Sequence, residues 1–394
     1  MIVLLYGRTA DPWVTPIIQD LQAAAAAQRR EIHALAIETA LRSPRQWQSV
    51  ERLYVLPFDL PVALPDGFSS ATPRLLAELF PTAEVVNPAA AHELVWDKIA
   101  TAHRLLERGV PMPETLITDD PHEAQAFVRR HQQAILKEPR ACGGHGHVVL
   151  LAGDDGALAG EVASGRRYAV ELEAAGLGRR LQHGVLALPP PFYLQRLVTG
   201  VGRGGVLSQA QVLRAYIIDG QIAFWTERTR DKIRRPADFI VSATFGARYR
   251  FVRAVGDALA AVARRAAEAL GLRVGVVDLL RAGDDGPFVL EADSDGQHML
   301  IDRSFKHIPE YRDVFDIDRM IADVLMTPAA PAARPLPRRP PLARRDAPRE
   351  RRDDPRVERR PRASGPRPAK PYAARPRPDG PRAAGPRSGG PRPG

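Results

Sequence analysis

The stretch "GVVDLLRAGDDGPFVLEADSDG" (residues 275–296) carries acidic side chains on two short apolar runs joined by a turn. Asp278 lies inside the first run, and Glu291 and Asp293 end the second. The glycine and aspartate residues between the runs predict a hairpin of two antiparallel strands. Such pairing would bring Asp278 close to Glu291, with Asp293 on the same face, because every second residue of a strand points to one side.

The three carboxylates predict a metal site on this hairpin. A charge inside an apolar strand is costly to bury unless it is paired or bound to a metal. Clustered carboxylates repel one another unless a cation lies among them, and ligation by oxygen alone fits Mg²⁺, with Mn²⁺ as a substitute. The alternative is a hairpin with polar ends, in which Asp278 faces solvent.

A second hairpin is predicted by "ILKEPRACGGHGHVVL" (residues 135–150). Lys137 lies in an apolar run, and a turn containing Gly143, Gly144 and Gly146 leads into another apolar run. P-loops and dinucleotide-binding turns continue into a helix, and no helix signal follows here. A turn of this kind can offer backbone N–H groups to phosphate. By itself, the stretch fits a flexible hairpin without a ligand equally well.

The first ninety residues alternate between strand and helix signals. Strand-like apolar runs lie at 1–7, 31–37, 51–58 and 83–88, and segments with helical spacing lie at 15–30 and 72–80. This alternation predicts a small α/β unit with a largely parallel sheet.

The residues that follow mix helices with hairpins. Helices are expected at 89–109, 119–131 and 251–271, a strand at 192–198, and a hairpin with an Asp-Gly turn at 213–228. Helices combined with antiparallel strands predict an α+β arrangement after the α/β unit.

The net charge of +10 is concentrated at the C-terminal end. Residues 328–394 hold 19 Lys and Arg against 6 Asp and Glu, and 18 of the 37 prolines. The other 327 residues carry 37 basic and 40 acidic side chains, so they are mildly acidic. A segment with so few large apolar residues cannot bury enough surface to fold, which predicts a disordered, partly polyproline-like tail.

Three further observations bound the class of protein. The single cysteine, Cys142, excludes an internal disulfide and has no zinc-site spacing. The N-terminal run "MIVLLYG" lacks a basic leader and a cleavage site, so it predicts a buried strand rather than a signal peptide. No apolar run is long enough to span a bilayer. We therefore expect a cytoplasmic protein with no membrane partner.

Five motifs, taken in order, resemble those of the ATP-grasp superfamily, in the layout of RimK-type carboxylate–amine (glutamate) ligases. They are "WDKIATAHRLLERGVPMPET", "ILKEPRACGGHGHVV", "YLQRLV", "LRAYIIDGQIAFWTER" and "GVVDLLRAGDDGPFVLEADSDG", within about residues 87–326. The resemblance implies a pre-grasp α/β domain at 1–90 and a two-lobed ATP-grasp domain at 91–327, with its lid lobe at about 135–192. The disordered Pro/Arg-rich tail would then occupy 328–394.

The resemblance also implies how ATP would be held. The implied ligands are, in chain order, Lys98, Lys137, Gly143, Gly144, Gly146, Gln195, Arg196, Leu197 and Val198. The two lysines would contact the α- and β-phosphates from opposite sides, the glycines would form the lid, and the last three residues would bind adenine through main-chain groups. Family members carry an acid nearby for the ribose, but residues 174–218 contain none. That leaves the amide of Gln195 or the hydroxyl of Thr199 for this contact.

The remaining site residues follow from the same resemblance. Arg214 and Arg228 match two arginines that bind the γ-phosphate and the acyl-phosphate, a role that suits the guanidinium fork. For Arg228, a plain surface ion pair is the alternative. Asp278, Glu291 and Asp293 match the metal ligands, although relatives usually carry Asn at the third position.

The implied reaction joins a carboxylate to an amine through an acyl-phosphate, with release of ADP and phosphate. Its partners would be a small-molecule or peptide carboxylate and an amine, and relatives often pair, so a homo-oligomer is an expectation of the same kind. The basic run "RDKIRR" (230–235) would face an anionic substrate or be a solvated loop. Two other functions stay open: a small-molecule kinase using the same site, and an ATP-binding scaffold whose basic tail binds RNA or another polyanion.

Overall fold

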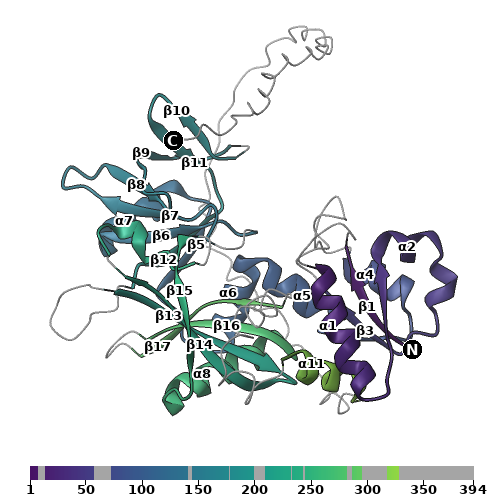
Figure 1. Cartoon of the computed structure of the whole chain (residues 1–394). Coiled ribbons are helices and arrows are strands. Elements are labelled where there is room, and N and C mark those ends of the chain that lie inside the picture. The colour runs from purple at the N-terminus through teal and green to yellow at the C-terminus, as the bar shows by residue number, and fades with distance from the viewer. Residues whose placement is uncertain are drawn as a thin grey trace, which may run out of the picture. The chain divides into compact units, whose positions relative to one another are not determined.

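The computed structural model describes residues 1–7, 14–56, 72–140, 144–176, 178–198, 209–231, 233–242, 245–281, 286–294 and 317–327 (Figure 1). These residues form a mixed α/β structure with three sheets, one parallel and two largely or wholly antiparallel. The tail at 328–394 lies outside the described residues, and the domain boundaries at 90 and 327 stay predictions. Among the described residues, no helix is long and apolar enough to cross a membrane.

The first sheet is the parallel one that the sequence predicts. Its order is β2-β1-β3-β4, and its elements with their helices are β1 (Ile2–Tyr6), α1 (Val14–Ala27), β2 (Ile32–Ala36), α2 (Ile37–Arg42), η1 (Pro44–Trp47), β3 (Arg52–Val55), α4 (Thr72–Leu79) and β4 (Glu84–Val86). Alternate residues of β1 enter two different cores, because both faces of this strand are covered. Leu4 packs with Ile17 and Leu21 of α1, whereas Leu5 packs with Phe80.

The single helix expected over 89–109 is wrong, because the structure breaks it at Asp97. Helix α5 (Ala89–Trp96) ends there and α6 (Lys98–Glu107) begins directly after it. Asp97 is extended, with φ −101° and ψ 106°, and its carboxylate accepts hydrogen bonds from the amides of Ile99 (2.9 Å) and Ala100 (3.2 Å). An aspartate that caps free N–H groups starts a new helix instead of continuing the old one.

The second sheet has the order β10-β11-β9-β8-β7-β6-β12-β5. Its elements are β5 (Thr115–Thr118), α7 (Pro121–His131), β6 (Gln133–Lys137), β7 (Val148–Ala152), β8 (Leu158–Val162), β9 (Arg167–Leu172), β10 (Arg180–Gln182), β11 (Val185–Leu188) and β12 (Phe192–Arg196). Strands β6 and β7 form the predicted glycine-turn hairpin, in which Leu136 pairs with Val148. Phe127 of α7 packs on these strands and closes their core.

The third sheet is antiparallel, in the order β15-β14-β13-β16-β17. Its strands are β13 (Gln209–Ile218), β14 (Gln221–Asp231), β15 (Arg248–Val252), β16 (Val274–Arg281) and β17 (Pro287–Asp293), accompanied by η2 (Pro236–Phe239), α8 (Asp257–Leu270) and α11 (Ile317–Met326). One face packs on α8. The other face packs on α1 and α11 at one end, through Tyr216 and Val276, and becomes polar at the next pair along, Arg214 and Asp278.

The helix expected over 251–271 begins six residues later than predicted. Phe251 and Val252 belong to β15, where they pair with Thr226 and Trp225 of β14. Aromatic and β-branched residues suit such a strand, and its partner lies more than twenty residues earlier, beyond the reach of a local helical pattern. The helix starts at Asp257, directly after Gly256.

A buried asparagine fastens the end of the first sheet to the start of β16. The side chain of Asn87 donates to the carbonyl oxygen of Val274 (2.6 Å) and accepts from the amides of Arg273 (2.7 Å) and Val274 (2.8 Å). Three of the four hydrogen bonds that this fully buried side-chain amide can make are thus formed inside the protein. Strand β16 therefore begins at a fixed place, four residues before Asp278.

Candidate functional site

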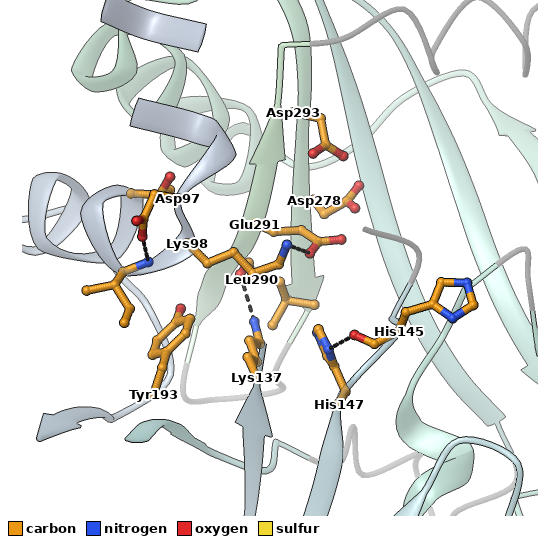
Figure 2. Close-up of polar contacts among 12 residues, drawn as sticks. Asp97, Lys98, Lys137, His145, His147, Tyr193, Asp278, Leu290, Glu291 and Asp293 are labelled. Atoms are coloured by element: carbon orange, nitrogen blue, oxygen red, sulfur yellow. Dashed lines mark hydrogen bonds and ion pairs between the residues drawn. The ribbon is translucent and has the colours of Figure 1, made fainter. Parts of the chain in front are cut away.

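The site lies where the end of β6 approaches β17 (Figure 2). Lys137 ends β6, and its ammonium group donates to the carbonyl oxygen of Leu290 at 2.9 Å. The side chain is 5% exposed, and this burial lowers the pKa of Lys137 to about 8, although the nearby charge of Glu291 acts in the opposite direction. A lysine held this way is a cation that an anionic ligand would stabilise.

Lys98 reaches the same place from the start of α6. Its Nζ lies 4.0 Å from Oε2 of Glu291, and Figure 2 shows this side chain and Lys137 approaching Glu291 from two elements. Burial alone would raise the pKa of Glu291, but Lys98, Lys137 and two arginines lower it to about 2. Glu291 is therefore ionised at neutral pH, with cations around it.

Asp278 is held by the two arginines that the sequence analysis assigns to phosphate. Arg214 lies opposite it on β13 and donates from Nε (2.7 Å) and Nη2 (2.8 Å) to its two carboxylate oxygens. Arg228, on β14, donates to the same carboxylate from Nη2. All three side chains are buried, so the surface ion pair considered for Arg228 is wrong. The countercharge of Asp278 comes from the protein itself.

The hairpin register is the predicted one, with Asp278 opposite Glu291. Asp293 lies two residues further on, 3.8 Å from Nη2 of Arg214. Figure 2 shows the three carboxylates together on neighbouring strands. Burial and the charge of Glu291 raise the pKa of Asp293 to about 6. Of the three acids, Asp293 is thus the one whose charge is least compensated by neighbouring side chains.

The donor set suits Mg²⁺ in chemistry, because all three groups offer carboxylate oxygen. The described residues contain no group of three His, Cys, Asp or Glu side chains already placed to hold a metal ion. Arg214 and Arg228 instead donate to both oxygens of Asp278. The metal role of these acids stays a prediction, and it requires Asp278 to exchange arginine for metal.

The glycine turn between β6 and β7 is described from Gly144 onward, and Gly143 lies outside the described residues. Gly144 and Gly146 have φ of +77° and +71°, a region that side chains disfavour. A Cβ atom on Gly144 would lie 2.9 Å from Cγ2 of Ile240, so the turn rests closely on the segment that follows η2. Both glycines thus let the backbone of the turn pack closely against a neighbouring group.

His147 is a site residue that sequence reasoning left without a role. It follows the turn beside Lys137, is 6% exposed, and donates from Nδ1 to the carbonyl oxygen of His145 at 3.2 Å (Figure 2). Burial first, and then the charges of Lys137 and Lys98, lower the pKa of His147 to about 3. It is neutral at physiological pH. The sequence signal that could have placed His147 in the site is its position next to Lys137 in the predicted hairpin.

The residues expected to bind adenine lie at the end of β12. The amides of Arg196 and Leu197 already donate to the carbonyl oxygens of Glu114 (2.8 Å) and Gln133 (3.4 Å), so these two donors are engaged within the sheet. Val198 ends the described segment, and Thr199 lies outside it. The adenine contacts stay predictions.

Gln195 has an unsatisfied acceptor. Its Nε2 donates to the hydroxyl of Tyr193 at 3.0 Å and approaches Thr115 at 3.3 Å. Its Oε1 is buried and has no hydrogen-bond partner among the described residues. An orphaned acceptor of this kind fits a ligand hydroxyl or amine better than an empty protein interior.

The basic run at 230–235 has acidic partners within the protein. Arg230 lies 2.8 Å from Asp238, and Arg235 lies 3.3 Å from Asp238 and 3.5 Å from Glu161. These two arginines are therefore neither plainly solvated nor uncompensated. Lys232 lies outside the described residues.

No family model matches the sequence, and no curated protein does. Solved structures do match the fold. Macrocyclase MdnC bound with precursor peptide MdnA from Microcystis aeruginosa MRC is 13% identical and has a TM-score of 0.50, over 83% of this chain and 99% of that one. The ATP-grasp ligase PsnB with a minimal precursor is 19% identical (82% and 98% covered, TM-score 0.49), and a RimK-domain ATP-grasp protein from Sphaerobacter thermophilus DSM 20745 is 17% identical (83% and 100% covered, TM-score 0.48).

At these identities the likeness is one of fold. The comparison therefore shows a shared fold, and the role that the sequence resemblance implies stays a prediction.

Proposed function

We propose that this protein is an ATP-dependent carboxylate–amine ligase that forms an amide through an acyl-phosphate. One observation carries the proposal: four cationic side chains from different elements converge on three acids at the meeting of the second and third sheets. The cations are Lys98, Lys137, Arg214 and Arg228, and the acids are Asp278, Glu291 and Asp293. So dense a set of opposite charges in a buried place suits a polyphosphate with its metal.

ATP would lie between the hairpin of β6 and β7 and the hairpin of β16 and β17. Lys137 and Lys98 would hold the α- and β-phosphates, with the turn at Gly144 and Gly146 closing over them. Gln195 would give its buried Oε1 to the nucleoside. This arrangement keeps water from the reacting phosphate.

Mg²⁺ would be held by Glu291 and Asp293, with Asp278 joining when its arginines turn to the substrate. When bound, the metal neutralises phosphate charge and polarises the bond that breaks. The acids fit this role by chemistry, because Mg²⁺ prefers carboxylate oxygen and shares it with substrate phosphates. A structure of PsnB is known with Mg and ADP.

Arg214 and Arg228 would stabilise the transferring phosphoryl group. A substrate carboxylate oxygen attacks the γ-phosphorus, the bond to the bridging oxygen breaks, and ADP leaves. An amine then attacks the carbonyl carbon of the acyl-phosphate, loses a proton and displaces phosphate, which gives the amide. Two guanidinium forks suit the charge on the phosphoryl oxygens, and no nucleophilic side chain is required.

A peptide is the first class of carboxylate to test. MdnC, whose fold is shared, was solved with a precursor peptide bound. Small-molecule acids form the second class. The domain division at 90 and 327 belongs to the same proposal.

The experiment is ADP release with MgATP and pools of acids, peptides and amines, with mass spectrometry of the products. We expect an amide that disappears in Glu291→Gln and persists in Asp219→Asn, a matched change of an exposed carboxylate. A phosphorylated product without an amide would indicate a kinase. No binding of MgATP at all would refute the proposal.

A further inference from the structure

Arg179 contacts the glycine turn from a distant part of the second sheet. It directly precedes β10, and its guanidinium donates from Nη1 to the carbonyl oxygen of Gly146. Its Nη2 lies 3.1 Å from Oε2 of Glu138. The side chain is three-quarters buried, so both contacts are partly shielded from water.

These two partners of Arg179 lie on opposite sides of the turn. Glu138 directly follows Lys137, and Gly146 directly precedes His147. Because Leu136 pairs with Val148, Glu138 and Gly146 face each other where the hairpin opens. One guanidinium therefore spans the opening and ties both sides to the same group.

The contact fixes the backbone of the turn. A carbonyl and the next amide share one rigid peptide plane, so holding the oxygen of Gly146 also orients the N–H of His147. That amide points back into the turn, 3.4 Å from the carbonyl oxygen of Gly144. A Cβ on Gly146 would lie 2.9 Å from Cβ of Glu138 and 3.4 Å from Nη1 of Arg179, so the packing leaves little slack.

The contact also balances charge next to Lys137, the lysine proposed to hold phosphate. Glu138 is an acid one residue from Lys137, and an uncompensated carboxylate there would repel a polyphosphate. Arg179 pairs with it. Burial lowers the pKa of Arg179 and the charge of Glu138 opposes this effect, as expected for a partly buried ion pair.

We propose that Arg179 is a positioning residue that holds the glycine turn in the shape that receives phosphate and offsets the charge of Glu138. The inference rests on the proposed nucleotide site, to which it adds a residue.

The first test measures the affinity for MgADP by direct calorimetry and the affinity for adenosine by displacement calorimetry. A lost charged hydrogen-bond pair typically weakens an interaction about tenfold or more, so Arg179→Ala should raise the Kd for MgADP by at least about tenfold. Adenosine affinity should not change, because adenosine carries no phosphate for the turn. A general loss of structure would weaken both ligands. Arg180→Ala is the matched control, since Arg180 pairs with Glu173 at the surface.

A second test separates position from charge. Hydrogen exchange of the peptide containing residues 144–148 should be faster in Arg179→Ala without nucleotide. The double variant Arg179→Ala with Glu138→Ala should recover part of the lost MgADP affinity, because the unpaired carboxylate is gone. Arg179→Lys should recover less than wild-type affinity, because one ammonium cannot serve both partners in the fixed geometry of the fork.

The outcomes distinguish this inference from the proposed function. If Lys137→Ala weakens MgADP binding and Arg179→Ala matches the wild type, the role of Arg179 is refuted and the site stands. Equal loss of adenosine and MgADP affinity in Arg179→Ala would also refute it. If the wild type binds neither nucleotide nor adenosine, the proposed function fails, and the role of Arg179 fails with it.

Discussion

Replacing Asp278 by Asn removes the one negative charge that two buried arginines share. Arg214 makes two hydrogen bonds to this carboxylate and Arg228 makes a third, and Asp278 is 1% exposed. Removing one partner of a buried ion pair typically costs about 3–5 kcal/mol, because the remaining charges stay buried without the partner that they contact most closely. Asp278→Asn should therefore lower the free energy of unfolding by about that amount.

The expected shift in melting temperature follows from the size of the folded part. For about 330 residues, the entropy of unfolding is about 0.7 kcal/mol per degree, so the loss corresponds to about 4–7 °C. The assay is thermal unfolding followed by circular dichroism, in EDTA and without nucleotide, so that neither metal nor ATP contributes. The measurement thus tests the ion cluster and not the proposed activity.

Asp219→Asn is the matched control. Asp219 also accepts two hydrogen bonds from one arginine, Arg273, at 3.2 and 2.7 Å, but it is 58% exposed. An exposed pair contributes less than about 1 kcal/mol, so its melting temperature should change by about 1 °C or less. Similar shifts for the two variants would refute the reasoning that burial makes the Asp278 cluster costly to break.

Two further outcomes are expected. Burial holds the pKa of both His92 and His147 at about 3, below the ordinary 6.5, so below pH 6.5 the unfolded chain takes up protons that the folded protein does not. Stability should fall by about 2 kcal/mol per histidine between pH 6.5 and pH 5. Thermal melts of His92→Gln over this range should show a weaker dependence of stability on pH than those of the wild type. An unchanged dependence would contradict this prediction. Gly144→Ala should cost more stability than Gly246→Ala and also weaken MgADP binding, because both sites have positive φ but only the first meets Ile240 at 2.9 Å. If Gly144→Ala and Gly246→Ala had equal effects on MgADP binding by calorimetry and on the melting temperature, the close approach of Gly144 to Ile240 would be unimportant.

The site hairpin could be predicted from local pattern alone. Two apolar runs and a Gly/Asp turn indicate the hairpin, whereas an irregularity between Asp278 and Leu279 shifts the register and places Asp278 opposite Glu291. The break at Asp97 was readable in principle, because aspartate caps helices, but the apolar spacing on both sides suggested one continuous helix.

Other features depend on partners far along the chain. The arginine clamp on Asp278 requires β13 to pair with β16, and Arg214 lies 64 residues before its partner. The local pattern indicated repulsion among the acids and hence a metal. In the structure, the arginines of β13 and β14 supply positive charge to Asp278. Arg179 lies 33 residues after Gly146 in a segment without hydrophobic period, so nothing near it in sequence revealed the contact.

The three hydrogen bonds of Asn87 have a consequence for protein engineering. They fix the start of β16, and the same face of that strand packs through Val276 on residues of β1 and α1. The hairpin that carries the acids is therefore built partly on the N-terminal sheet. A chimaera that exchanges the first ninety residues would have to keep Asn87 and the apolar surface of α1. Without them, β16 would lose the hydrogen bonds and the packing that fix the position of Asp278.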